Sequence, residues 1–147
     1  MDNKQLFKRY SLLNQSSSNS TAGQSLVEFA LLLPVLALLL AGVFDLGRAF
    51  HALIAINNAG REAARYGTLH RSDLTGMRNA AIQEAQNSGI VIASDSIALT
   101  CPDAGTAAPC ARDTSMMVQI TYQYNPILGF FFPAGVPIRS TVEMRIP

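Results

Sequence analysis

The sequence predicts an α+β protein with one long N-terminal helix, a second short helix and a three-stranded antiparallel sheet. Two observations lead to this fold class. A single uncharged apolar run spans residues 29–44, and two segments near the C-terminus alternate apolar and polar residues with a period of two. An apolar run of this length is typical of a membrane helix, and the alternation is typical of strands with one buried face.

The apolar run reads FALLLPVLALLLAGVF from Phe29 to Phe44, with Glu28 before it and Asp45 after it. At ~1.5 Å rise per residue it is a little short of the ~30 Å hydrocarbon core of a bilayer. Three interpretations are open: an anchor that stays in the mature chain, the core of a cleaved secretory signal, and a buried core helix. The flanking residues favour an anchor, which we place at residues 24–45.

The charges of the N-terminal segment predict the orientation of this anchor. Lys4, Lys8 and Arg9 precede the apolar run, and positive residues stay on the cytoplasmic side. Residues 1–23 are therefore expected to form a cytoplasmic leader, and residues 46–147 an extracytoplasmic domain. The chain is then a single-pass protein of the cytoplasmic (inner) membrane, in contact with membrane lipid.

The two cysteines fit an exported domain. Cys101 and Cys110 are separated by a loop-like segment that contains Pro102, Gly105 and Pro109. A disulfide persists in an oxidising compartment, and closing so short a loop stabilises a fold by roughly 2–3 kcal/mol. We expect this disulfide; the alternative is two unpaired buried thiols.

Helical character continues beyond the membrane run. From Asp45 to Tyr66 apolar or small residues recur at steps of three and four, which predicts one continuous helix from near Ser25 to near Tyr66. Its second half is amphipathic and has a face to bury. The residues of the predicted buried face are Leu46, Ala49, Phe50, Leu53, Ile56, Gly60, Ala63 and Ala64.

A second, shorter helix follows. Ser72 or Asp73 is placed to cap its start and Gly89 to end it. Its predicted buried face consists of Leu74, Met77, Ala81 and Ala85.

Strands are predicted after this helix. Residues 90–100 are β-branched and small, and residues 116–125 and 138–146 alternate strictly. We expect the three strands to pack one face on the amphipathic half of the long helix, which leaves little room for a deep active site.

Composition excludes several classes of function. The chain has 147 residues, 14% of them charged, with a net charge of +1, so it lacks the positive field that nucleic-acid binding needs. Two Cys and two His make a metal enzyme improbable, and we expect His51 and His70 to be solvated or packing residues. No catalytic constellation stands out, so we expect no enzyme activity, no cofactor, no metal and no small-molecule substrate.

A carboxylate at the edge of an apolar segment needs an explanation. Glu28 is either hydrated among the lipid headgroups or gains a positive partner when chains assemble. An α-amine created by cleavage after Gly23 would be such a partner, one helical turn away in a staggered neighbour.

The spacing around Glu28 carries a family resemblance. A Gly, four residues, then Glu and an aromatic residue before an apolar helix resembles the prepilin processing motif of type IV pilins. The longer run from Gly23 to Gly67, which contains VEFAL, DLGR and AGREAARYG, resembles the N-terminal region of TadE-like proteins. These are minor pilins or pseudopilins of the Tad (tight adherence, Flp) pilus system.

The resemblance implies roles for particular residues. Gly23 would precede the bond cut by a membrane prepilin peptidase, and Gln24 would become the new N-terminus. Glu28 would pair with an N-terminal amine in the assembled pilus, and Phe29 stands where the family usually has an aromatic residue. The implied fold is pilin-like. The implied partners are the peptidase, other pilin or pseudopilin subunits and the inner-membrane pilus platform.

Three functions remain open at this point. The first is a minor pilin that joins or primes a Tad pilus, enters it in some cases, and so supports adhesion. The second is an unprocessed bitopic scaffold of the pilus or secretion machinery. The third is a binding domain released by signal peptidase near Gly42. An apolar loop at residues 126–133 either covers the core or contacts a neighbouring subunit or the bilayer surface.

Overall fold

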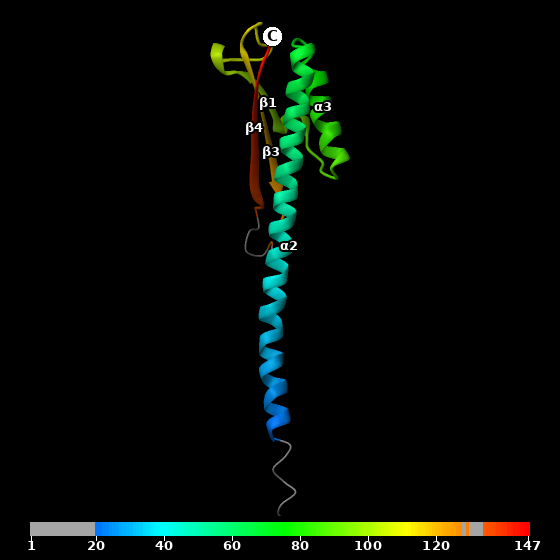
Figure 1. Cartoon of the computed structure of the whole chain (residues 1–147), viewed down its shortest axis with the longest axis vertical. Coiled ribbons are helices and arrows are strands. Elements are labelled where there is room, and N and C mark those ends of the chain that lie inside the picture. The colour runs from blue at the N-terminus through cyan, green and yellow to red at the C-terminus, as the bar shows by residue number, and fades with distance from the viewer. Residues whose placement is uncertain (1–19, 128, 130–133) are drawn as a thin grey trace, which may run out of the picture. The chain divides into compact units, whose positions relative to one another are not determined.

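The computed structural model describes residues 20–127, 129 and 134–147 of the chain (Figure 1). They belong to two compact units, one ending at Gly42 and the other comprising Val43–Pro147. The predicted leader lies outside the described residues up to residue 19, and so do residues 128 and 130–133 of the predicted apolar loop.

Helix α2 runs from Ser20 to Leu69. It begins before the predicted start near Ser25 and ends after the predicted end near Tyr66. Pro34 lies inside it, and the helix continues on both sides of this residue.

The buried face of α2 in the second unit is made of small residues. Ile56 is the one large side chain that is fully buried on this face. A Cβ added at Gly60 would lie 3.0 Å from Val142 Cγ2, so the absence of a side chain lets the sheet approach the helix closely. The other buried apolar residues of this face are alanines: Ala52, Ala55, Ala59, Ala63 and Ala64.

Two members of the predicted buried face are not buried. Leu46 is 59% exposed and Phe50 is 57% exposed. Periodicity could not separate them from the core: Leu46 is 18 residues, or five full turns, before Ala64 and falls at the same angle around the helix, yet Ala64 is buried and Leu46 is exposed. That part of the prediction was wrong.

Helix α3 spans Leu74–Asn87, and its ends are capped as the sequence predicts. Asp73 is the N-cap, and its Oδ1 accepts a hydrogen bond from the Gly76 N–H at 2.8 Å. At the other end the N–H groups of Gly89 and Ile90 donate to the carbonyls of Gln86 and Ala85, the pair of bonds that defines a Schellman motif. Gly89 has a φ of 74°, a conformation that favours glycine.

The sheet is antiparallel, with the strand order β2-β1-β3-β4. The three long strands are those that Figure 1 labels, and β2 is a two-residue addition at the edge that the sequence did not predict. The bounds are Ile97–Cys101 for β1, Thr106–Ala107 for β2, Ser115–Tyr124 for β3 and Val136–Arg145 for β4. Two short 3₁₀ segments, η1 at Ser94–Ser96 and η2 at Pro102–Ala104, flank β1.

The core lies between the sheet and the helices. Met116, Val118 and Ile120 alternate along β3 and are fully buried, as their period of two predicts. Met77 of α3 reaches the same core, since a Cβ added at Gly67 would meet the side chains of both Met116 and Met77. Figure 1 shows α3 alongside the C-terminal part of α2. The predicted α+β fold class is confirmed.

Candidate functional site

The residues of the predicted processing motif lie in the first turns of α2. Gly23 and Gln24 are inside the helix, and nothing lies within 4 Å of the position a Gly23 Cβ would take. Glu28 and Phe29 are exposed. Gln24 Nε2 donates to Glu28 Oε1 at 3.2 Å, so a single helical turn joins the residue after the expected cut to the expected assembly carboxylate.

The apolar run that follows is not buried by the protein. Among the described residues, one helix is long and apolar enough to cross a membrane, with a mean hydropathy of 2.5 in its most apolar window and none of that window buried. The large side chains from Leu26 to Phe44 are at least half exposed. This argues against a buried core helix and fits single-pass anchoring by an N-terminal helix.

Asp45 directly follows the apolar run and connects α2 with the C-terminal end of β3 through hydrogen bonds. Its carboxylate Oδ1 accepts from the backbone N–H of Ile127 at 2.7 Å and lies 3.0 Å from Tyr124 Oη. The Tyr124 hydroxyl is also 2.9 Å from the Asp45 backbone carbonyl. Although it directly follows an exposed apolar run, Asp45 is only 9% exposed.

Arg48 completes this cluster. Its Nη1 is 3.5 Å from Asp45 Oδ1, and its guanidinium carbon lies 5.5 Å from the centre of the Tyr124 ring. Burial, and next the hydrogen bond to Asp45, raise the pKa of the Tyr124 phenol above its usual value. The phenol therefore stays a neutral donor at physiological pH. We call Asp45, Arg48, Tyr124 and Ile127 the Asp45 cluster.

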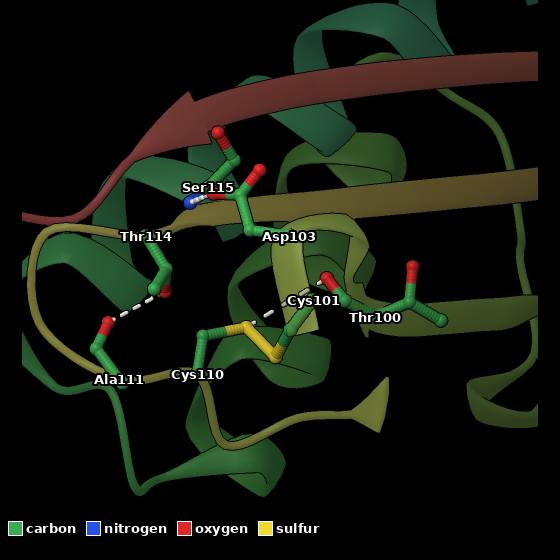
Figure 2. The surroundings of a disulfide bond; sticks show 7 residues. All are labelled: Thr100, Cys101, Asp103, Cys110, Ala111, Thr114 and Ser115. Carbon is green, nitrogen blue, oxygen red and sulfur yellow. Dashed lines mark hydrogen bonds between the residues drawn. A yellow bond between two sulfur atoms is a disulfide. The ribbon is translucent and has the colours of Figure 1, made fainter. Parts of the chain in front are cut away.

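The predicted disulfide between Cys101 and Cys110 is present (Figure 2). Both cysteines are buried, and the bond connects the end of β1 with the segment that leads into β3. Cys110 Sγ lies 3.7 Å from the Thr100 carbonyl oxygen. The bridge therefore fixes the end of β1 remote from the Asp45 cluster.

A carboxylate inside the disulfide loop adds a second tie to the sheet. Asp103 Oδ2 accepts from the backbone N–H of Ser115, the first residue of β3, at 2.6 Å. Thr114 Oγ1 donates to the Ala111 carbonyl at 2.7 Å in the turn before that strand (Figure 2). The loop is thus held to β3 by a hydrogen bond as well as to β1 by the disulfide.

A polar corner connects the end of α2 with the start of α3. Tyr66 Oη donates to Asp73 Oδ2 at 2.9 Å, and its ring stacks on His70 with centroids 4.6 Å apart. The Gly76 N–H and the Tyr66 hydroxyl lower the pKa of the Asp73 carboxyl. His70 is thus a packing residue, as the sequence predicts, and this corner fixes the connection between the helices.

The described residues offer a metal ion no group of three or more His, Cys, Asp or Glu side chains. The larger surface hollows are open and lined by residues of α2, α3 and β4, including Glu62, Asn79 and Glu84. Arg65 Nη2 lies 2.8 Å from Glu62 Oε1, and this ion pair lowers the pKa of Glu62.

Sequence reasoning used Asp45 only as the boundary of the apolar run and missed the cluster around it. The signal was a lone carboxylate at the end of an apolar helix, followed by an arginine three residues later. Tyr124 gave no such signal, because nothing in its own segment distinguishes it from the other alternating residues of β3.

The comparisons with known proteins bear on the N-terminal part of the chain. A family model described as TadE-like protein matches residues 23–65, which confirms the family resemblance. The matched segment contains Gly23, Glu28, the apolar run and the start of the Asp45 cluster. No curated protein and no solved structure matches the chain. The match and the exposed apolar helix fit a membrane protein associated with the Tad pilus.

Proposed function

We propose that this protein, identified by its TadE-like segment, is a membrane-anchored minor pilin or pseudopilin that takes part in assembling a Tad pilus and so in surface adhesion. One observation supports this most: the family match covers both the Gly23–Phe29 motif and an apolar helix that the protein itself leaves exposed. In this role the chain performs no chemistry of its own. It is the substrate of a prepilin peptidase and a partner of other pilin subunits.

The physical role of Glu28 in such an assembly is charge pairing. In a single chain the carboxylate is exposed and accepts a hydrogen bond from the Gln24 side chain. In a bundle of apolar helices an unpaired carboxylate is strongly unfavourable, by several kcal/mol. The α-amine of a processed Gln24 in a neighbouring subunit would relieve this and would fix the axial stagger of the two helices.

Processing is tested by the intact mass of the protein extracted from membranes. We expect loss of residues 1–23, and we expect Gly23→Leu to keep the leader because a branched side chain does not fit a narrow peptidase site. Gly42→Leu is the matched control, since both glycines lie in α2 with nothing within 4 Å of the added Cβ. A leader lost from the Gly23→Leu chain would refute the processing proposal. Retention of residues 24–42 in the wild-type chain excludes release by signal peptidase.

Assembly is tested separately with Glu28→Gln, which keeps size and polarity but removes the charge. We expect this variant to be inserted and cleaved, yet to be depleted from sheared pili. Glu143→Gln is the control, because Glu143 is an exposed residue of β4 in the other unit. Equal recovery of both variants in the pilus fraction would exclude the pairing role.

A second function, an unprocessed bitopic scaffold of the same machinery, is favoured by one observation. Gly23 and Gln24 lie inside a helix, and a hydrogen bond to Glu28 closes the turn across the expected cleavage site. Proteases generally need an extended substrate, so this turn would have to unwind before cleavage. A full-length mass for the wild-type chain in membranes would select this function over the first.

The proposed location is the inner membrane, with the leader in the cytoplasm and the domain outside it. The oxidation state of the two cysteines tests this location, because Cys101 and Cys110 form a disulfide that needs an oxidising compartment. Under non-reducing, denaturing conditions, neither cysteine of membrane-extracted protein should react with an alkylating reagent. Quantitative alkylation of both would place the domain on the reducing side.

A further inference from the structure

The first turns of α2 in the second unit present an apolar surface that the described residues of the domain leave exposed. Leu46 and Phe50 are more than half exposed. Together with Ala49, Leu53 and Ile138 they line a small cavity of about 180 Å³ that has only apolar side chains around it. This surface follows directly in sequence on the exposed apolar run that ends at Phe44.

The apolar run is shorter than the hydrocarbon core of a bilayer, and this surface would supply the missing length. From Phe29 to Phe44 the helix rises by about 24 Å, which is several Å less than a hydrocarbon core of about 30 Å. Continuing to Phe50 adds about 9 Å, with Asp45 as the carboxylate that must be accommodated. Continuing in the other direction would instead bring in Glu28, which is exposed.

Asp45 can be accommodated because the protein, not water, supplies its hydrogen bonds. Ile127 N, Tyr124 Oη and Arg48 Nη1 all approach Oδ1, and the residue is almost fully buried. A buried carboxylate oxygen with two hydrogen-bond donors and an ion-pair partner does not require bulk water. Glu28 differs, since its described hydrogen bond comes from a single exposed glutamine.

The polar residues at the same level are those that membrane interfaces collect. Arg48 keeps more than half of its side chain exposed while its guanidinium lies over the Tyr124 ring. Arg48, His51, Tyr122 and Tyr124 border a hollow of about 160 Å³. Arginine and tyrosine favour the headgroup level, where an apolar body and a polar tip are both satisfied. Arg48 is two residues from both Leu46 and Phe50, about 200° around the helix, so it lies on another side of it.

We propose that the domain is seated in the bilayer surface, with Leu46 and Phe50 in contact with phospholipid acyl chains, Arg48 reaching the headgroups from another side of the helix, and Asp45 held below the headgroups by Tyr124 and Ile127. The occupant of the apolar surface is lipid because the surface continues the apolar run of the anchor and because its polar neighbours suit headgroups. The proposal rests on membrane anchoring and goes beyond the pilus role: a chain that never enters a pilus would be seated in the same way.

Tryptophan fluorescence tests the contact, because the chain has no Trp of its own. Full-length Leu46→Trp and Phe50→Trp variants are placed in phosphatidylethanolamine–phosphatidylglycerol vesicles with brominated acyl chains. Leu69→Trp is the control, because Leu69 is 75% exposed on the same helix. It lies about 28 Å along the helix from Phe50. We expect about a twofold loss of emission for the first two variants and none for the control, since bromine quenches at contact with the hydrocarbon.

Quenching of Phe50→Trp no stronger than that of Leu69→Trp would overturn the proposal. Repeating the measurement at lower protein-to-lipid ratio separates lipid from a second copy of the chain. Quenching that stays constant supports lipid, whereas quenching that appears only on dilution means that another copy covers the surface in the denser membrane, and the proposal fails.

The part played by Asp45 has its own readout in the Phe50→Trp background. Adding Tyr124→Phe removes one donor from the carboxylate, so we expect weaker quenching as the domain shifts toward water. Adding Tyr66→Phe removes a hydroxyl that also donates to a carboxylate, that of Asp73, but in the corner between α2 and α3, and should leave the quenching unchanged. Equal quenching in the two double variants would refute the seating role of the cluster.

Discussion

The hydroxyl of Tyr124 offers a direct test of how strongly the Asp45 cluster holds the domain together. Tyr124→Phe deletes only the oxygen that lies between the backbone carbonyl and the carboxylate of Asp45, at 2.9 and 3.0 Å. The ring itself remains, and so does its packing in the core. The loss of stability therefore measures the hydrogen bond and little else.

The magnitude follows from the burial and charge of the partner. Hydrogen bonds to charged groups contribute about 1.5–3 kcal/mol, and the Asp45 carboxylate keeps Ile127 N as a donor and Arg48 as an ion-pair partner after the change. The lower part of that range applies, so we expect a loss of about 2 kcal/mol. In a domain of the size of Val43–Pro147 this corresponds to a fall in melting temperature of about 8 °C.

Thermal unfolding of the full chain in detergent, followed by circular dichroism, measures this shift. Tyr122→Phe is the matched control: Tyr122 is a half-buried tyrosine on the same strand. We expect it to melt within a degree or so of the wild type, since its hydroxyl has no hydrogen-bond partner among the described residues and contributes little. Equal melting temperatures for the two variants would show that the geometry of the Asp45 cluster does not stabilise the fold.

Three further outcomes are expected. Folding raises the pKa of Tyr124, so above about pH 10 this tyrosine ionises more readily in the unfolded chain than in the folded one, and the free energy of unfolding should fall. Urea titrations at several pH values should show a shallower fall for Tyr124→Phe. Replacing Cys101 and Cys110 together by Ala should lower stability by about 2.5 kcal/mol, and unchanged denaturation midpoints would contradict a structural role for the bridge. Gly60→Leu should destabilise by about 1–3 kcal/mol through overpacking against the β4 valine 3.0 Å from an added Cβ, whereas Gly47→Leu, with no such neighbour, should not.

Elements controlled by local sequence were predictable. The start of α3 follows from Asp73, whose side chain caps the first turn, and its end follows from Gly89, whose backbone adopts a positive φ. The burial of β3 follows from the alternation of its residues. These features depend on neighbours within a few positions, which a single sequence displays.

The first strand shows where periodicity misleads. The segment predicted as a strand from Ile90 to Thr100 contains only β1, from Ile97 to Cys101. Ile90 and Ile92 are buried and Val91 is exposed, so the alternation is real, but these residues pair with no strand in the part of the chain that the structure describes. Alternating burial arises in any extended segment that crosses a core, whether or not a ladder forms beside it.

The Asp45 cluster could not be predicted for a different reason. Its members Asp45 and Tyr124 are 79 residues apart, and Ile127 contributes a backbone N–H, which carries no residue-specific signal. The processing motif is the opposite case. Gly23 and Glu28 are recognisable from spacing alone, and their roles are chemical expectations about a peptidase and a neighbouring subunit.

The buried alanines of α2 influence a distance elsewhere in the domain, that between the Tyr124 hydroxyl and the Asp45 backbone. Ala52, Ala55 and Ala59 are buried and project little, which permits the close approach of the sheet that is found at Gly60. That closeness brings the Tyr124 hydroxyl within reach of the Asp45 backbone. A larger side chain at any of these positions would push the helix away from the sheet. The hydrogen bonds of Asp45 would then lengthen, although the substituted residue makes no contact with Asp45. A substitution in this row of alanines would then change the structure around Asp45, so the alanines support a contact in which they take no part.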